Sequence, residues 1–324
     1  MGLKPLNIVL YDWFSMTSKI DSVDSLLKLI GLENETLKFQ PCKGMHGYKD
    51  RLSFSGINIH FNGREDMGIW LEMSGQGCRA FETYSNTDWS VLFYMVVHES
   101  EDYHLTRLDV AYDDKDGVLS LDKLYKETEQ QNYTSKFSSY QLTKSNNGIT
   151  VYFGSVKSNV LLRFYDKAKE RGLEDGTHWV RCEFQLRDDK ALNFIKLTDT
   201  IGKNFFGVLN NYIRFVVHSA VYQDNKYKLK TAKWWSKFLE SVAKVSIYTP
   251  CDLDYNLERL DNYTFNLAGN AVNTAIKIHG IEEFIRRLAE RSCMPNKKYK
   301  HLEDVNGVVK DDPVIKFLKE RGAL

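Results

Sequence analysis

Residues 105–114 read LTRLDVAYDD, and apolar and polar side chains alternate along this stretch. Side chains two positions apart on a β-strand share a face, so the alternation predicts a strand with one face turned toward a core. Arg107, Asp109 and Asp113 then share the opposite face. Because aspartate is disfavoured in the middle of a strand, we expect Asp109 to have a partner, either a metal ion or an arginine.

Two later stretches show the same alternation. In HWVRCEFQL, residues 178–186, a central glutamate shares its face with an arginine. In VLLRFYDKAKER, residues 160–171, a tyrosine shares its face with two cations. If the three strands lie in one sheet with these faces aligned, they form one site. Its residues would be Asp109, Asp113, Glu183, Tyr165, Arg163, Lys167 and Arg181.

Such a site would suit attack on a phosphodiester. Two or all three of the carboxylates would form a hard oxygen site for Mg²⁺ or Mn²⁺, and this ion would polarise a phosphoryl oxygen. A tyrosine hydroxyl is a weak nucleophile at its ordinary pKa of about 10, and we expect the nearby cations and the metal to favour the phenolate. Attack by Tyr165 on phosphorus would form a phosphotyrosine bond and release a 3′-hydroxyl. That bond conserves the energy needed to rejoin the strand.

Each residue also has a plainer interpretation. A tyrosine on a strand usually serves packing, and Asp109 or Glu183 could be an ion-pair partner of Arg107 or Arg181. The aligned set is more specific than its parts, and it depends on the three strands being neighbours. The hydroxyl of Tyr165 should then lie under roughly 10 Å from Asp109 and Glu183, because a metal-bridged phosphate would join them.

The remaining pattern indicates an α+β protein with a central antiparallel sheet and flanking helices. Residues 1–197 are expected to form a catalytic domain of two similar halves, 1–100 and 101–197. Residues 198–324 are expected to be mostly helical and to serve DNA binding or dimerisation. In the first half, Leu52–Phe61 is predicted as one strand that turns at Asn62-Gly63, a strong hairpin signal.

Composition limits the class of protein. The chain has 324 residues, 43% of them hydrophobic, and a formal net charge of +1, so charge alone does not indicate DNA binding. The five cysteines are scattered and form no C-x-x-C pair, which favours a reducing cytoplasm over a disulfide or zinc framework. We expect no signal peptide and no membrane span.

Basic residues are nevertheless concentrated locally. Residues 225–244 carry six lysines and one glutamate, and a second basic region runs from Arg286 to Lys300. The tract KWWSKF (233–238) could stack on bases or contact phosphate, or it could be a buried aromatic helix. The candidates for DNA contact in and beside this tract are Lys230, Lys233, Trp234 and Lys237.

The segment SGQGCR, which ends at Arg79, has two interpretations as well. It could be a tight turn whose glycines permit a positive φ. Alternatively, its backbone amides and Arg79 could contact a phosphate. Arg107 is a further candidate for DNA contact.

Several motifs together resemble the replication initiation factor family, which contains rolling-circle initiators of Gram-positive plasmids and phages and related relaxases of conjugative elements. They occur in order across more than half of the chain. The motifs are DWFSMT (12–17), EMSGQGCRAFE (72–82), RLDVAYDD (107–114), VYFGS (151–155), RFYDKAKER (163–171) and WVRCEFQLR (179–187).

The resemblance implies sequence-specific nicking and rejoining at a replication origin through a 5′-phosphotyrosine intermediate with a divalent metal, Mg²⁺ or Mn²⁺. The DNA would be single-stranded or an extruded hairpin. Its nucleophile would be Tyr165 and its metal ligands Asp109, Asp113 and Glu183. The family's plasmid initiators act as dimers, and a host helicase is an implied partner in a bacterial cytoplasm. The region after Thr198 matches no motif of the family.

Two other functions remain open. A hydrolytic metal-dependent nuclease could use Asp109 and Glu183 without the tyrosine, although such enzymes commonly carry a lysine two residues past the carboxylate, where this chain has Gln185. A non-catalytic origin-binding protein could retain the same fold, with the carboxylates as ion-pair partners.

Overall fold

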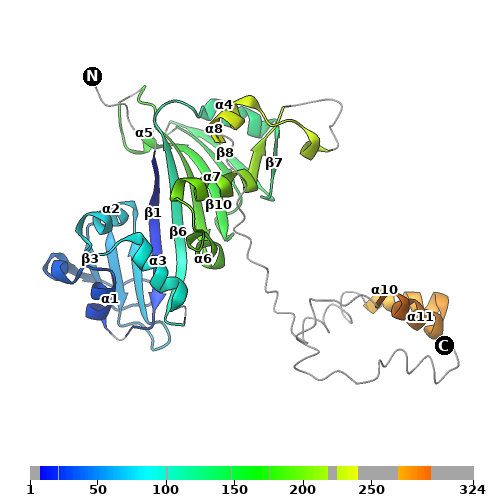
Figure 1. Ribbon diagram of the computed structural model, residues 1–324, viewed down its shortest axis with the longest axis horizontal. Coiled ribbons are helices and arrows are strands. Elements are labelled where there is room, and N and C mark those ends of the chain that lie inside the picture. Colours follow the sequence, from blue (N-terminus) through cyan, green and yellow to red (C-terminus); the bar gives the residue numbers. More distant parts are fainter. Residues whose placement is uncertain are drawn as a thin grey trace. The chain divides into compact units, whose positions relative to one another are not determined.

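The computed structural model describes residues 8–20, 22–99, 101–146, 148–174, 176–217, 225–239 and 269–292. The chain divides into two compact units, Met1–Thr249 and Pro250–Leu324. Within the second unit the described elements are α10 (Gly269–His279) and α11 (Ile281–Ser292). Every other described element belongs to the first unit (Figure 1).

The first unit is built on one ten-stranded sheet in which all neighbouring strands are antiparallel. This confirms the predicted α+β class with a central antiparallel sheet. In spatial order the strands are β2 (Gln40–Lys43), β3 (Asp50–Phe54), β4 (Ile57–Phe61), β5 (Ile69–Met73), β1 (Ile8–Ser18), β6 (Tyr103–Asp114), β11 (Val180–Arg187), β10 (Val160–Asp166), β9 (Gly148–Phe153) and β8 (Tyr140–Ser145). A small second sheet pairs β7 (Tyr133–Ser135) with β12 (Ile213–Phe215).

The sheet consists of two halves with the same strand order. In each half the first strand is followed by a helix and a four-stranded meander, and the last strand of the meander returns to pair with the first. The first half comprises β1, α1 (Val23–Leu29) and β2 to β5, and the second comprises β6, α4 (Leu121–Glu129) and β8 to β11. Strands β1 and β6 pair with each other and join the halves.

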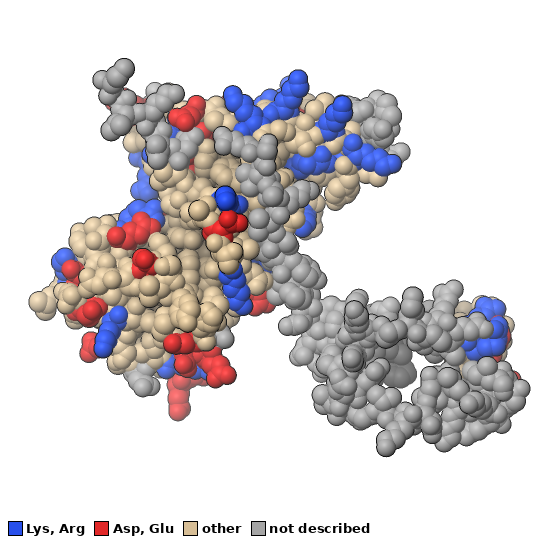
Figure 2. Space-filling model, viewed as in Figure 1, with Lys and Arg blue, Asp and Glu red and all other residues tan. Residues whose placement is uncertain are grey.

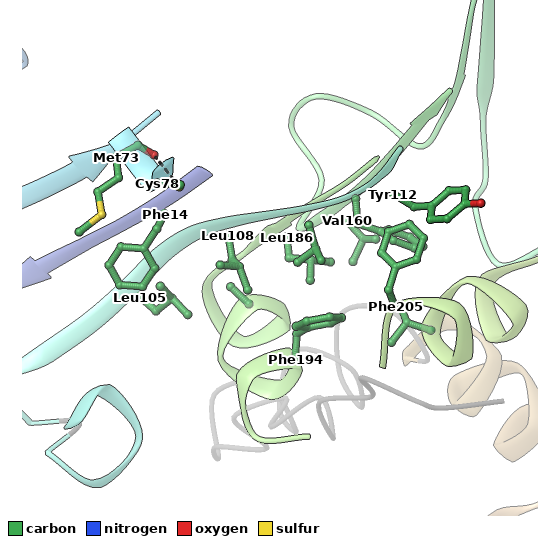
Figure 3. Packing of buried hydrophobic residues seen from close by; sticks show 14 of the residues in the cluster. Phe14, Met73, Cys78, Leu105, Leu108, Tyr112, Val160, Leu186, Phe194 and Phe205 are labelled. Carbon is green, nitrogen blue, oxygen red and sulfur yellow. Dashed lines mark hydrogen bonds between the residues drawn. The ribbon is translucent and has the colours of Figure 1, made fainter. Parts of the chain in front are cut away.

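Helices cover one face of the sheet, and the strand residues on that face form the core with them (Figures 1 and 3). Phe14, Leu108 and Phe184 are fully buried there, as the alternation along the strands predicts. The covering helices are α1, α2 (Gly75–Tyr84), α3 (Trp89–His98), α4, α6 (Asp188–Ile195), α7 (Ile201–Tyr212) and α8 (Lys233–Leu239), with the short helices η1 (Glu33–Lys38), η3 (Lys226–Lys228) and α5 (Lys167–Glu170) at the margins. The described helices leave the polar face of the sheet open.

One hairpin differs from its prediction. The segment Leu52–Phe61 is not a single strand, because β3 ends at Phe54 and β4 begins at Ile57. Ser55 and Gly56 adopt φ values of 45° and 85°, and two consecutive positive φ angles are what a two-residue type I′ hairpin requires. Ser-Gly is a weaker signal than the Asn62-Gly63 pair that follows, which lies instead in the connection to β5.

The first unit extends well past residue 197, so the chain does not divide where its motifs end. Helix α7, β12 and α8 lie within residues 198–239, and their apolar side chains join the same core. Trp235 of α8 is fully buried and packs against Phe164 of β10 and Phe215 of β12, with ring centroids 6.3 and 4.9 Å apart. The hydrophobic core is therefore incomplete without α7, β12 and α8.

We expect Trp235→Ala to lower the free energy of unfolding by about 3–5 kcal/mol, the usual cost of removing a large buried aromatic side chain. Urea denaturation followed by circular dichroism would measure it. The neighbouring exposed Lys237→Ala should change stability by less than about 0.5 kcal/mol. Equal effects of the two substitutions would contradict the packing of α8 against the sheet.

Candidate active site

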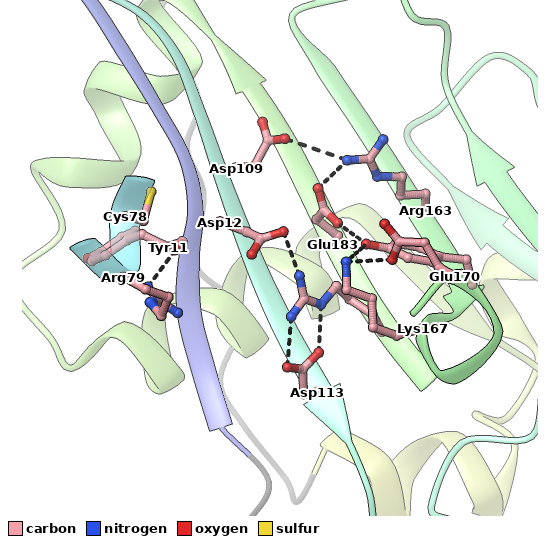
Figure 4. Close-up of polar contacts among 12 residues, drawn as sticks. Tyr11, Asp12, Cys78, Arg79, Asp109, Asp113, Arg163, Lys167, Glu170 and Glu183 are labelled. Carbon is pink, nitrogen blue, oxygen red and sulfur yellow. Dashed lines mark hydrogen bonds and ion pairs between the residues drawn. The ribbon is translucent and has the colours of Figure 1, made fainter. Parts of the chain in front are cut away.

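The three strands that carry the predicted site are direct neighbours, in the order β6, β11, β10. In their registers Arg163 lies opposite Glu183, Tyr165 lies opposite Arg181, and Glu183 lies opposite Ala111. The polar side chains of all three strands therefore point to the open face of the sheet, as the alternation predicts (Figure 4).

Tyr165 is held by Glu183. Its hydroxyl donates a hydrogen bond to Glu183 Oε2 at 2.7 Å, well inside the predicted 10 Å limit. The second carboxylate oxygen, Oε1, pairs with the guanidinium of Arg163. Lys167 Nζ lies 3.4 Å from the tyrosine hydroxyl and 2.5 Å from Glu170 at the surface. A tyrosine hydroxyl, a carboxylate and two cations thus share one cluster.

The groups around Tyr165 shift the pKa of its hydroxyl. Burial and the neighbouring charge of Glu183 raise the pKa of the tyrosine, although Arg181 acts in the opposite direction. Glu183 itself stays charged, because Arg163 and the hydrogen bond from Tyr165 outweigh its burial and lower its pKa. Both effects favour the neutral phenol, which donates to the carboxylate of Glu183, and the phenolate expected beside a metal ion stays a prediction.

Asp109 is fully enclosed beside this cluster. Arg107 Nε and Nη2 donate to its two oxygens at 2.8 and 2.6 Å, and Arg163 Nη2 lies 3.6 Å from Oδ2. Burial raises the pKa of Asp109 to about 7, against the opposing effect of Arg107 and with the support of the charge on Glu183. Arg163 therefore lies between the two carboxylates and contacts both.

Among the described residues, Asp113 shares no ion-paired arginine with Asp109 and Glu183. Both of its oxygens accept hydrogen bonds from Arg181, from Nε at 2.6 Å and from Nη2 at 2.8 Å. In the described part of the chain no three carboxylate, histidine or cysteine side chains converge as a metal site would require. Asp113 is instead the ion-pair partner of Arg181, so the structure gives no support to Asp113 as a third metal ligand.

Sequence reasoning missed Asp12, the second partner of Arg181. Its Oδ2 accepts a hydrogen bond from Arg181 Nη1 at 2.5 Å. Strand β1 has a register shift between Tyr11 and Trp13, and such a bulge re-aims side chains. Asp12 thereby reaches the polar face. An aspartate inside the apolar run LYDWF was the only sequence signal.

The SGQGCR segment is neither a turn nor an open phosphate loop. It begins α2, with Ser74 as N-cap. Gly75 and Gly77 are absent from the positive-φ residues, and their lack of a side chain serves close packing: a Cβ on Gly75 would lie 2.6 Å from Asp12 Oδ1. Arg79 donates to the carbonyl of Tyr11 at 2.8 Å and pairs with Glu82 at 2.6 Å, which ties α2 to β1.

The basic region lies elsewhere on the unit. Lys230, Lys233 and Lys237 are exposed, and Figure 2 shows lysines and arginines gathered over α4, α8 and the segment before α8. Trp234 is only half-buried, packing 5.0 Å from the ring of Phe215 with Lys123 Nζ 5.1 Å from its own ring. Its neighbour Trp235 is fully buried, so KWWSKF is largely a packing helix. Of the second basic region, residues 293–300 lie outside the described residues.

Comparison with known proteins covers both halves of the sheet. A family described as replication initiation factor matches residues 103–289, and a family described as rolling circle replication initiation protein N-terminal domain matches residues 8–96. The first match begins at Tyr103, the first residue of β6.

A protein of Bacillus subtilis (strain 168) assigned as the DNA relaxase NicK is 27% identical over 268 residues, which cover 76% of this chain and 75% of that protein. The solved structure of a rolling circle replication initiator protein from Geobacillus stearothermophilus aligns with a TM-score of 0.65 and 32% identity, covering 75% of this chain and 100% of that one. No helix among the described residues is both long and apolar enough to cross a membrane.

We expect Asp113→Ala to destabilise the protein by about 3–5 kcal/mol, because it removes one partner of a buried ion pair. Asp66→Ala is the matched control, since it breaks an exposed aspartate–arginine pair and should destabilise the protein far less, because exposed ion pairs contribute little. Denaturation midpoints would compare the two. If Asp113→Ala proved as mild as the control, the pair between Asp113 and Arg181 would have no structural role.

Proposed function

This chain belongs to the replication initiation factor family, and from that membership we propose that it is a rolling-circle initiator that nicks and rejoins one DNA strand through Tyr165. The observation that carries the proposal is the position of Tyr165. Its hydroxyl lies on the open face of the sheet, bound to Glu183 and flanked by Arg163 and Lys167. A tyrosine used only for packing would point into the core.

The reaction follows from these contacts. As the hydroxyl oxygen of Tyr165 attacks phosphorus, its proton passes to Glu183 Oε2, which already accepts the hydrogen bond. The bond between phosphorus and the 3′-oxygen breaks, a 5′-phosphotyrosine forms, and the leaving oxygen takes a proton from water to become a 3′-hydroxyl. Rejoining is the reverse: the 3′-hydroxyl attacks the phosphotyrosine and the proton returns to the tyrosine.

The cations would act on the phosphate. Arg163 lies between two carboxylates and offers a planar set of donors that matches phosphate oxygens. Lys167 adds a positive charge beside the tyrosine hydroxyl. Because a nonbridging phosphate oxygen brings negative charge to this point, both cations would stabilise the crowded, charged transition state.

Asp109 and Glu183 fit a divalent metal as a pair. They lie on adjacent strands, both carry the oxygen ligands that Mg²⁺ and Mn²⁺ prefer, and each influences the charge of the other. Mg²⁺ is commonly held by one or two carboxylates together with substrate phosphate. Bound there, the ion would polarise the scissile phosphate. Asp113 is left out of this pair.

DNA would cross the open face of the sheet, where Arg107 lies beside Asp109. The lysines over α4 and α8 would add sequence-independent contacts to phosphate. We also propose a homodimer, and a helicase partner that unwinds the strand behind the new 3′-hydroxyl, in the reducing cytoplasm of a bacterial host.

The central test is the covalent adduct. Overlapping single-stranded fragments of the DNA element that carries the gene are labelled at the 3′ end, incubated with protein and Mn²⁺, and separated under denaturing conditions. A 5′-phosphotyrosine transfers the label to the protein, whereas Tyr165→Phe should give no labelled protein and retain DNA binding. Tyr152→Phe, on the neighbouring strand β9, is the matched control and should form the adduct.

The other outcomes identify the rival functions. Cleavage without labelled protein would indicate a hydrolytic nuclease. Binding without cleavage by the wild-type protein would indicate a non-catalytic origin-binding protein. An adduct that persists in Tyr165→Phe would refute Tyr165 as the nucleophile.

Metal binding is tested separately from cleavage. Mn²⁺ binding can be measured by electron paramagnetic resonance with Tyr165→Phe and single-stranded DNA, so that no product forms. We expect Asp109→Asn and Glu183→Gln each to weaken Mn²⁺ binding at least roughly tenfold, the lower end of the loss seen when a metal site is disturbed. Asp113→Asn, measured where it remains folded, should bind Mn²⁺ normally. Equal losses in all three variants would contradict the two-carboxylate site.

A further inference from the structure

A second site lies on the open face in the first half of the sheet. A cavity of about 380 Å³ is formed there by side chains of β1, β5 and β6, the end of β11 and the loop before β3. This volume is in the range of small-molecule sites. The residues used below are Trp13, Tyr48, Trp70, Glu72, Arg107 and Arg187.

The walls of the cavity are flat and aromatic. Trp70 stacks on His60 with ring centroids 4.3 Å apart, and Tyr48 lies 6.2 Å from the same indole. Across the cavity, the guanidinium of Arg107 lies 4.3 Å from the ring centre of Trp13. Aromatic rings and arginine planes are the surfaces on which nucleic-acid bases stack.

Two polar side chains that could form further hydrogen bonds also line the cavity. Glu72 accepts one long hydrogen bond, from Asn58 Nδ2 at 3.5 Å. Arg187 lies directly opposite Arg107 in the strand register, and like charges in that position repel. Arg107 is compensated by Asp109, whereas the buried Nε of Arg187 has no hydrogen-bond partner among the described residues. A ligand with both donors and acceptors would satisfy Glu72 and Arg187 together.

The cavity occupies the place in the first half that the tyrosine site occupies in the second. Glu72 lies on the last strand of its half, opposite Asn58 and Ser15, and Glu183 lies on the last strand of its half, opposite Arg163 and Ala111. When the two glutamates are matched, His60 takes the position of Tyr165 and Trp13 that of Asp109. The carboxylate is retained, but the nucleophile and the second carboxylate are replaced by aromatic rings.

We propose that this cavity binds one guanine base of the single-stranded DNA whose phosphate is attacked by Tyr165. This inference rests on the proposed function and deepens it. Guanine offers N–H donors on its Watson–Crick edge, which a carboxylate such as Glu72 accepts, and O6 and N7 acceptors, which an arginine such as Arg187 binds. The purine ring would stack against Trp70. Arg107 links the two sites, because it pairs with Asp109 and lines the cavity.

The position of the cavity suits a base close to the nick. Strands in a sheet are about 4.8 Å apart, so β6 is roughly 10 Å from β10, which carries Tyr165. A strand that crosses the sheet from β10 toward β1 would therefore reach the cavity within a few nucleotides of the scissile phosphate. Part of the origin specificity would then come from the first half of the sheet.

The test uses Tyr165→Phe protein, so that binding is measured without covalent capture. Fluorescence anisotropy compares a twelve-residue oligothymidylate with the same strand carrying one central guanine, adenine or cytosine. We expect the guanine strand to bind roughly 5- to 100-fold more tightly than oligothymidylate, the effect of one good bidentate base contact. Adding Glu72→Gln should abolish this preference and leave binding of oligothymidylate unchanged.

Two further variants separate stacking from folding. Trp70→Ala should weaken binding of all four strands roughly 5- to 100-fold, with its fold checked by thermal melting. Tyr94→Ala removes an exposed aromatic ring from helix α3 and should change nothing. The absence of a guanine preference, or its persistence in Glu72→Gln, would overturn the proposal.

The measured guanine preference is independent of the outcome of the nicking assay. An adduct at Tyr165 without a guanine preference would refute the base site and leave the nicking function intact. A guanine preference without any adduct would support the base site and refute the nicking function.

Discussion

Glu183 is a buried carboxylate in the centre of the sheet, and a charge in that place must be paired. Arg163 pairs with one oxygen, and the hydroxyl of Tyr165 donates to the other. This requirement explains why the three strands carry polar residues at matched positions. It also fixes the tyrosine on the open face, because its hydroxyl would otherwise leave an oxygen of Glu183 unsatisfied.

The site is held together across the two halves of the sheet. Arg181 of the second half donates hydrogen bonds to Asp113 on β6 and to Asp12 on β1. Asp12 reaches it because of the bulge in β1, and the missing side chain of Gly75 leaves room for its carboxylate. The DWFSMT and SGQGC motifs thus contact each other, and Asp12 of the first contacts Arg181, which lies opposite Tyr165 in the strand register.

The pKa of Tyr165 bears on how the proposed reaction begins. Burial and the charge of Glu183 raise the pKa of Tyr165 and so favour its neutral phenol. Arriving phosphate would draw Arg163 from the carboxylates, and a metal on Asp109 and Glu183 would offset their charge. In the proposed mechanism, substrate binding and activation of the tyrosine are therefore the same event.

The sequence by itself determined which side chains share a face of each strand. Alternation along β6, β10 and β11 placed Arg163, Tyr165 and Glu183 on one side, because side-chain direction on a strand is a local property. Only the tertiary structure decided which charges meet. Asp113 and Asp109 share a face, yet only Asp113 lies opposite Arg181 in the strand register, and Asp109 pairs instead with Arg107 two residues away on its own strand. The same holds for α7, β12 and α8, whose packing on the sheet depends on contacts distant in sequence, and for the aromatic cavity, whose walls come from strands that no local pattern brings together.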